Sequence, residues 1–304
     1  MNLIYEGTDI TPFVNITRCL HRDVSSGRAD TLELEMDHAE TWYRWKPQTD
    51  DAIRLRHGGY DTGRLYLNSI LPKGDKYVIL ATSLPAAARR KAWGTYQAET
   101  LENIFEKCAA ECGMEAKLFG VDGCIYYPFV LRRNEGCAAF LNRLGEWEGA
   151  MVKAFNGAFR AIGVGYAQEM NAVHNVRITT EQDGVAYVQR ENIKYSGLTV
   201  STPYAQASAY DESAVYYHQP VLTHLPARNN AQAGHWARGL LMMNNRKAEE
   251  LNISSGFNAG MSAMVRVDVE GNTDANGAWI VDETTHDFVN ERTFTRLLRV
   301  VDFG

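Results

Sequence analysis

Alternating apolar and polar residues dominate the first part of the chain. Leu32, Leu34 and Met36 alternate with two glutamates, a period of two that predicts a strand with one buried face and one wet face. Similar runs follow at 52–56, 65–70 and 77–81, and turns rich in Gly, Asp and Pro separate them at 58–63 and 72–76. Short strands at this close spacing favour a small β-barrel or sandwich over residues 1–86.

The pattern changes to a helical period after residue 99. A first apolar stripe predicts a helix that starts behind an N-cap at Thr100 and stops before Gly113. A second stripe predicts a helix from about Glu135 to Trp147, with Asn134 as its N-cap.

Extended signals accompany these two helices. Segment 125–129 is typical of extended chain, and Pro128 within it indicates an edge strand or a turn. Asn156-Gly157 between two apolar runs predicts a tight hairpin. We therefore expect a small α+β insert domain over residues 87–163.

Strand patterns return from about residue 172. Segments 185–188 and 198–201 are candidate strands, and an apolar stripe predicts a third helix over about 231–251. Residues 164–304 are predicted to form a second β-domain that contains this helix. The fold class is therefore α+β, mainly β, with two barrel or sandwich domains flanking a small α+β insert.

An internal repeat links the two ends of the chain. Residues 63–70 align with 277–284, and the flanking pairs are 53–56 with 265–268 and 77–80 with 295–298. Each copy reads as strand, polar turn, glycine-led strand, loop and strand. Two unrelated antiparallel meanders can also look alike, so that alternative stays open. We interpret the match as two copies of one β-domain.

The repeat supplies the candidate functional residues. Arg64, Leu65, Trp279 and Val281 occupy corresponding parts of the two copies, and His286 follows in the second copy. We treat these five as structural or interface candidates, and we expect Trp279→Ala to disturb the second β-domain or a contact there.

Composition and length narrow the protein class. The chain has 304 residues, of which 45% are hydrophobic and 22% are charged, and these ordinary values exclude a disordered or low-complexity protein. Single cores tend to stop growing at roughly 250–300 residues, so we expect two or three cores. We expect no membrane segment, because no apolar stretch reaches ~18 residues. The first residues do not indicate a signal peptide.

The charge balance does not favour nucleic-acid binding. The chain has 31 basic and 37 acidic residues, for a net charge of −6, whereas a protein that grips nucleic acid usually presents a basic surface. Arg89-Arg90-Lys91 is the densest basic run. We expect it to be a solvated corner, with nucleic-acid contact as the alternative.

The five cysteines favour core packing over chemistry. Without a secretory signal, reduced thiols are expected. A zinc set of Cys108, Cys112, Cys124 and Cys137 is conceivable, but it lacks a Cys-x-x-Cys knuckle. We expect no metal and no cofactor.

No catalytic signature is present in the sequence. His286-Asp287 could be half of a triad, but no serine or cysteine lies in a nucleophile context. Glu146 and Glu148 suggest a glycosidase acid pair, yet residues two apart on a helix face different ways. A cell-wall hydrolase therefore stays only as an alternative function.

An aromatic segment supports a second alternative. Trp42, Tyr43 and Trp45 could stack on a sugar, as in a carbohydrate- or host-binding module. We favour the simpler interpretation that they form an amphipathic turn that packs between domains.

The order of these segments resembles the late control protein D family, the tail hub proteins of contractile phages. Relatives occur in R-type bacteriocins and at the start of type VI secretion spike proteins. The resemblance covers nearly the whole chain, although helix 134–144 departs from the family pattern at Gly136 and Cys137. The segments that carry it are 28–37, 62–67, 92–97, 100–105, 134–144, 277–281 with His286, and 294–297.

This resemblance implies a structural, non-enzymatic trimer with two barrel domains of tube-protein type around the insert. Three chains would present six near-equivalent units, so that a threefold central spike could meet a sixfold tail tube. The implied partners are the chain itself, the spike, tube or tube-initiator proteins and other baseplate proteins. Because the sequence stops at Gly304, we expect the spike to be a separate protein.

The resemblance also implies a location. The protein would lie in the tail baseplate of a phage or a bacteriocin particle that assembles in the bacterial cytoplasm. The acidic balance suits a conduit through which nucleic acid passes without sticking.

Overall fold

The computed structural model describes the chain except residues 38–43, 75, 179–183, 272–273 and 302–304. Strands make up 47% and helices 19% of it, which confirms the α+β, mainly β fold class. Trp42 and Tyr43 of the expected aromatic turn lie outside the described residues. No helix among the described residues is long and apolar enough to cross a membrane.

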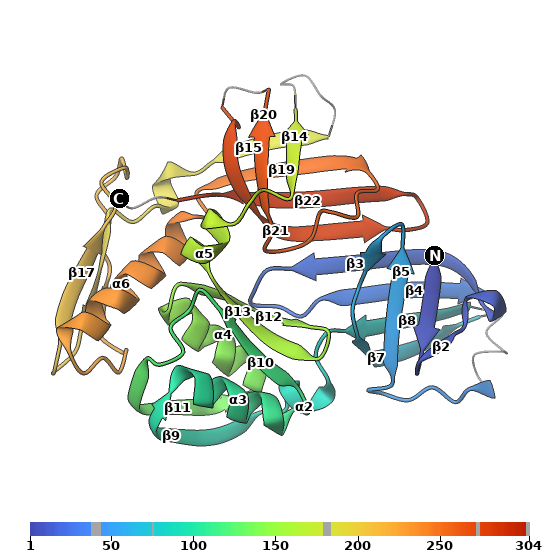
Figure 1. The fold of residues 1–304 in the computed structure, drawn as a ribbon, viewed down its shortest axis with the longest axis horizontal. Helices are drawn as coiled ribbons and strands as arrows, with labels where there is room; N and C mark the ends of the chain where they lie inside the picture. Colours follow the sequence, from blue (N-terminus) through green and yellow to red (C-terminus); the bar gives the residue numbers. More distant parts are fainter. Residues whose placement is uncertain (38–43, 75, 179–183, 272–273, 302–304) are drawn as a thin grey trace.

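The first β-unit is an antiparallel sheet that curls around one core (Figure 1, blue). Alternation in β4 (Thr31–Asp37) places Leu32, Leu34 and Met36 inside, because successive side chains point to opposite faces. All six strands contribute side chains to one buried cluster. Their spatial order is β3 (Asn15–Val24), β4 (Thr31–Asp37), β8 (Lys76–Thr82), β7 (Leu65–Lys73), β5 (Ala52–His57) and β1 (Asn2–Tyr5). Short elements at its rim are β2 (Thr8–Asp9), η1 (Thr11–Phe13) and β6 (Tyr60–Asp61).

The second β-unit repeats this order (Figure 1, yellow-green to red). In both units the strands follow one another in space as second, third, sixth, fifth, fourth and first along the chain. Chance meanders would not share a six-strand order, so the repeat interpretation is supported. The units differ in one direction: β1 is antiparallel to β5, whereas β14 is parallel to β20. The strands are β15 (Val185–Gln189), β19 (Glu249–Gly256), β22 (Arg292–Arg299), β21 (Gly277–Asp287), β20 (Arg266–Glu270) and β14 (His174–Arg177).

A β-bulge in each unit shows which residues of the two repeats correspond. The β7–β8 ladder shifts between Leu67 and Ser69, and the β21–β22 ladder shifts between Val281 and Glu283. These positions match in the alignment of 63–70 with 277–284, which is therefore confirmed.

The two flanking alignments are wrong by two residues. Leu67 faces Ala81 and Val281 faces Leu297, so Ala81 corresponds to Leu297 and not to Arg299. In the same way, Ile53 faces Leu65 and Val267 faces Trp279, so Ile53 corresponds to Val267 and not to Val265. A slip of two keeps every side chain on its face, so the apolar pattern could not reveal it.

The insert contains two small sheets and three helices. The first predicted helix is confirmed: the Thr100 side chain accepts a hydrogen bond from the Asn103 backbone N at 3.3 Å, and Gly113 adopts a positive φ of 65°. Asn156 and Gly157 both have positive φ at the predicted hairpin. The elements are α2 (Ala86–Arg89), β9 (Ala92–Thr100), α3 (Leu101–Glu111), β10 (Glu115–Phe119), β11 (Tyr126–Glu135), α4 (Cys137–Trp147), β12 (Ala150–Phe155) and β13 (Ala158–Gly163).

The predicted start of the second helix is wrong. Strand β11 continues its pairing with β9 as far as Glu135, so Asn134 and Glu135 belong to the strand. Gly136 is the N-cap of α4 instead. An added Cβ on Gly136 would lie 2.7 Å from the Ala88 carbonyl oxygen, so the close approach of α2 requires glycine there.

The third predicted helix exists but ends at Asn245. Ala248 lies beyond it and Leu251 belongs to β19, because Leu251 is drawn into the core of the second β-unit. The helix covers one face of a third small sheet (Figure 1). These elements are α6 (Asn230–Asn245), β16 (Gly197–Ser201), β17 (Gln206–Tyr210) and β18 (Val221–Leu222); α5 (Val164–Glu169) and η2 (Glu191–Ile193) are short connections.

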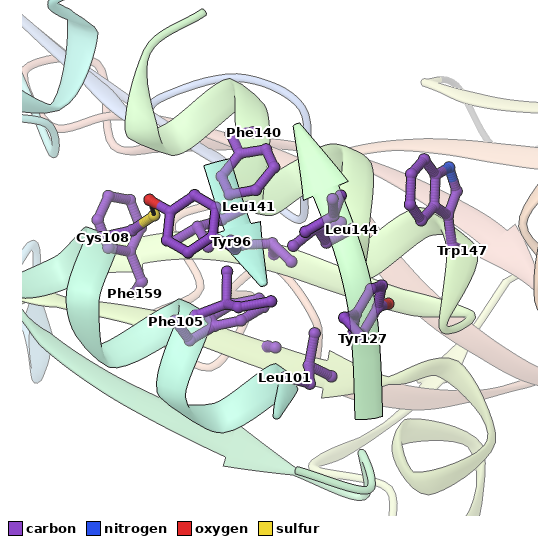
Figure 2. Close-up of a cluster of buried hydrophobic side chains, with 14 of the residues drawn as sticks. Tyr96, Leu101, Phe105, Cys108, Tyr127, Phe140, Leu141, Leu144, Trp147 and Phe159 are labelled. Carbon is purple, nitrogen blue, oxygen red and sulfur yellow. Dashed lines mark hydrogen bonds between the residues drawn. The ribbon is translucent and has the colours of Figure 1, made fainter. Parts of the chain in front are cut away.

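Helix α6 packs against α4, and one buried cluster extends from residues 84–161 into 198–241. Figure 2 shows its centre, where Phe105 of α3 and Leu144 of α4 point toward Tyr127 of β11. We call α2, α3, α4, α6 and the three small sheets the lateral body. The domain limits at 86 and 163 remain predictions.

Candidate functional site at the seam between the two units

The two β-units meet edge to edge. Residues Leu20–Val24 of β3 pair antiparallel with Glu283–Asp287 of β21, and His21 lies opposite His286. This seam joins both units into one 14-stranded sheet. It uses the part of β21 beyond Ile280, where the pairing with β20 has ended.

The bulge residue Asp282 is the centre of a charge network at the seam. Its carboxylate accepts hydrogen bonds from the Ser25 hydroxyl at 2.7 Å and from Arg296 Nε at 3.1 Å, and Arg246 Nη2 lies 3.6 Å away. Burial alone would raise the pKa of Asp282, but Arg246, Ser25 and Arg296 outweigh burial and lower it. The adjacent Glu283 pairs with two arginines of the first unit, Arg22 and Arg28.

A buried ion cluster ties the insert to both units. Lys153 of β12 contacts Asp23, and its Nζ lies 3.1 Å from Asp30 Oδ2. Asp23 also accepts a hydrogen bond from the Ala263 backbone N of the second unit at 3.0 Å. Burial lowers the pKa of Lys153 to about 7, helped by Arg160, and burial raises the pKa of Asp30. Sequence reasoning missed this cluster, because a lone lysine in an apolar strand has no distinguishing pattern.

His286 is a packing residue of this seam. Its Nδ1 lies 3.1 Å from the Thr293 hydroxyl and its Nε2 lies 2.9 Å from the Met261 carbonyl oxygen. Its ring centroid lies 4.2 Å from that of Tyr60, with the two ring planes tilted by 56°. Burial lowers its pKa to about 4, so the imidazole is neutral near pH 7. Asp287 instead accepts hydrogen bonds from backbone N–H groups of the next turn. The pair therefore lacks the geometry of a catalytic dyad.

The other candidates do not converge on one site. Leu65 lies in the core of the first unit, and Trp279 and Val281 lie in the core of the second; all three are fully buried. Trp279 Nε1 donates to the Ala275 carbonyl at 2.8 Å. Arg64 is exposed, and its backbone N donates to Asn156 Oδ1 at 3.1 Å, which links the first unit to the insert hairpin.

The two glutamates of the suspected acid pair have separate roles. Glu148 is buried and accepts hydrogen bonds from Tyr127, from Trp236 Nε1 at 2.7 Å and from His235 Nε2 at 2.7 Å, so it fastens α6 to the insert. Glu146 accepts a hydrogen bond from Asn142 on the helix surface.

The cysteines also show no shared site. All five are free thiols, and Cys124 is exposed while the others are buried. Within the described part of the chain, no group of three or more His, Cys, Asp or Glu could hold a metal ion.

Two strand edges that correspond to the seam have no partner strand among the described residues. Among the described residues β15 pairs only with β19, whereas β3, its counterpart, pairs with β4 and also with β21. Beyond Leu67, whose backbone bonds to Asp50 and Asp51, β7 pairs within the described part of the chain only with β8, whereas the matching part of β21 is covered by β3. Leu71 on this stretch of β7 is 58% exposed. Unpaired edges of this kind are templates for another strand.

Comparisons with known proteins identify this architecture among tail proteins. No family model and no curated protein sequence matches the chain. The 43 kDa tail protein of prophage MuSo2 from Shewanella oneidensis matches with a TM-score of 0.76 at 12% identity, over 98% of both chains. A tail protein from Neisseria meningitidis matches with a TM-score of 0.76 at 11% identity, over 98% of this chain and 95% of that one.

A third match comes from a secretion machine. A type VI secretion component of E. coli, described as structurally similar to bacteriophage T4 tail proteins, matches with a TM-score of 0.62 at 12% identity. The match covers 99% of this chain and 78% of that one. The expected likeness to tail hub proteins is thus confirmed for the fold.

Proposed function

We propose that this chain is a structural hub protein of a phage tail or a related injection particle. Three copies form a ring of six β-units that joins a threefold central spike to a sixfold tail tube. Its partners are the spike, tube or tube-initiator proteins and surrounding baseplate proteins, with assembly in the bacterial cytoplasm. The fold shared with tail proteins supports the structural role.

The observation that supports the ring is the seam, together with the two unpaired strand edges, of β15 and β7, that correspond to it. Within the chain, β3 of the first unit pairs with β21 of the second. If the units are equivalent, β15 of the second unit pairs with β7 of the first unit in the next chain. Repeating one contact six times closes a ring, because heterologous interfaces close when their rotation allows it.

The seam also defines the register of this contact. His21 and Tyr187 correspond, because they face Leu32 and Leu251, which occupy matching positions in the two sheets. The contact that matches Arg22 opposite Thr285 is then Val188 opposite Leu71. Pro72 takes the place of His286, and because proline has no N–H the ladder has one hydrogen bond fewer there.

Cysteine cross-linking tests both ring and register. Val188→Cys with Leu71→Cys, in a Cys124→Ser background, should give covalent trimers under mild oxidation, since opposed strand residues lie within disulfide range. Native mass measurement should show three chains in the unmodified protein. The matched control is Ala186→Cys with Leu71→Cys, which is two residues out of register and should cross-link poorly. A protein that stays monomeric, or a control that cross-links equally well, would refute the ring.

We also propose that the chain is not an enzyme. His286 and Glu148, the strongest catalytic candidates, are both occupied by packing hydrogen bonds. Cell-wall clearing by the purified protein in a zymogram would overturn this and favour the hydrolase alternative.

A further inference from the structure

A groove of about 570 Å³ lies between the first β-unit and the lateral body. We call it the α2–α4 groove. Its walls come from the β3–β4 loop at 27–29, the α2 region at 84–91, the start of α4 at 134–142 and the β12–β13 hairpin. Seven of its sixteen lining residues are glycine or alanine, so short side chains leave the hollow open.

The floor of the groove is apolar. Leu84, Val152 and Phe159 line it, and each side chain is otherwise buried in the cluster of the lateral body. A partner side chain placed there would remove apolar surface from water, which is favourable.

The rim of the groove is basic in a protein of net charge −6. Arg28, Arg89 and Lys91 line it against a single carboxylate, Glu135, which Arg143 already pairs. Arg89 donates a hydrogen bond to the neutral Asn68 side chain and forms no ion pair with a residue that the structure describes.

Lys91 is the least engaged of these cations. It is exposed and has no ion pair to any described residue. Two positive charges of the Arg89-Arg90-Lys91 run are therefore available above an apolar floor.

We propose that the α2–α4 groove binds an acidic peptide segment of another protein. Carboxylates of the segment meet Arg89 and Lys91, and one small apolar side chain fills the hollow. A small free anion could pair with the two cations, but it would leave the apolar floor of the groove exposed to water. A single-stranded nucleic acid is typically held by stacking of its bases on exposed aromatic side chains, whereas Phe159, the aromatic residue that lines the groove, is 1% exposed. Only the identification of this partner as a component of the tail particle rests on the proposed function.

Fluorescence anisotropy with two labelled peptides tests the groove. The probe Glu-Asp-Leu-Asp-Glu should bind the wild-type protein about tenfold more tightly than Gln-Asn-Leu-Asn-Gln, a gap that narrows at high salt. Arg89→Glu with Lys91→Glu should weaken acidic-peptide binding about tenfold or more. Ala139→Trp, an exposed lining position, should weaken it by filling the hollow while all charges remain. Arg292→Glu is the matched control, an exposed arginine of the second unit whose loss should leave binding within about twofold.

Several outcomes would overturn the proposal. Equal affinity for the two peptides would show that charge does not contribute to binding. Unchanged affinity of the Arg89→Glu, Lys91→Glu variant would show that the peptide binds elsewhere. Displacement of the peptide by a short oligonucleotide at lower concentration than by excess unlabelled peptide would assign the groove to nucleic acid. Because this assay needs no ring, its failure is distinguishable from failure of the trimer cross-link.

Discussion

The two β-units share a strand order and a bulge but differ in what their loops carry. Between its second and third strands the first unit has only residues 25–30, whereas the second unit has residues 190–248, which include α6 and a small sheet. The strands preserve the equivalence that the proposed ring of six would require, and the loops break it. A repeated scaffold with unequal loops can thus present sixfold contacts through its sheets and threefold contacts through its lateral body.

The largest expected effect compares the matching core positions Trp279 and Leu65. Trp279→Ala should lower the free energy of unfolding by about 4 kcal/mol and Leu65→Ala by about 3 kcal/mol, because the larger fully buried side chain leaves the larger cavity. Urea unfolding measures both values. A smaller loss of unfolding free energy for Trp279→Ala than for Leu65→Ala would contradict the view that both side chains fill the same position of the two cores.

A second comparison uses the two bulge residues. Asp282→Ala should lower the free energy of unfolding by about 3 kcal/mol, because buried Arg246 loses its carboxylate partner. Asn68→Ala at the matching bulge should cost less than about 1 kcal/mol, since the hydrogen bond that its side chain accepts comes from the exposed Arg89. Equal losses in denaturant titrations would show that the seam charges do not distinguish the two bulges.

The last comparison is a pH dependence that His286 of the second unit contributes. Burial also lowers the pKa of His21 in the first unit, so a substitution is needed to isolate the effect of His286. Between its lowered pKa of about 4 and the ordinary 6.5, His286 is neutral in the folded chain and charged in the unfolded chain. The unfolded state then binds the extra proton, so stability falls as pH falls through this window, by about 2 kcal/mol at pH 5. The matching residue in the first unit, Pro72, does not titrate.

The measurement is the difference in unfolding free energy between wild type and His286→Gln. That difference should shrink by about 2 kcal/mol from pH 7 to pH 5, because only the wild type loses stability through this group. A difference that is independent of pH would contradict a neutral buried imidazole.

Local chemistry determined much of the fold from the sequence alone. The alternation at 32–36 defines a half-buried strand, the Asn156-Gly157 turn defines a hairpin, and the cap at Thr100 defines a helix start. The repeat between 63–70 and 277–284 was also visible, because a shared strand preserves its side-chain pattern. These features depend on neighbours within a few residues.

Tertiary structure decided whatever depends on distant partners. Helix α4 begins later than predicted because Glu135 pairs with β9. Helix α6 ends earlier than predicted because Leu251 packs in the core of the second β-unit. The two flanking repeat alignments were wrong by two residues because a shift of two leaves the apolar pattern unchanged. The seam and the contacts of Lys153 join residues more than a hundred positions apart, and no local pattern specifies which strand edges or charges will meet.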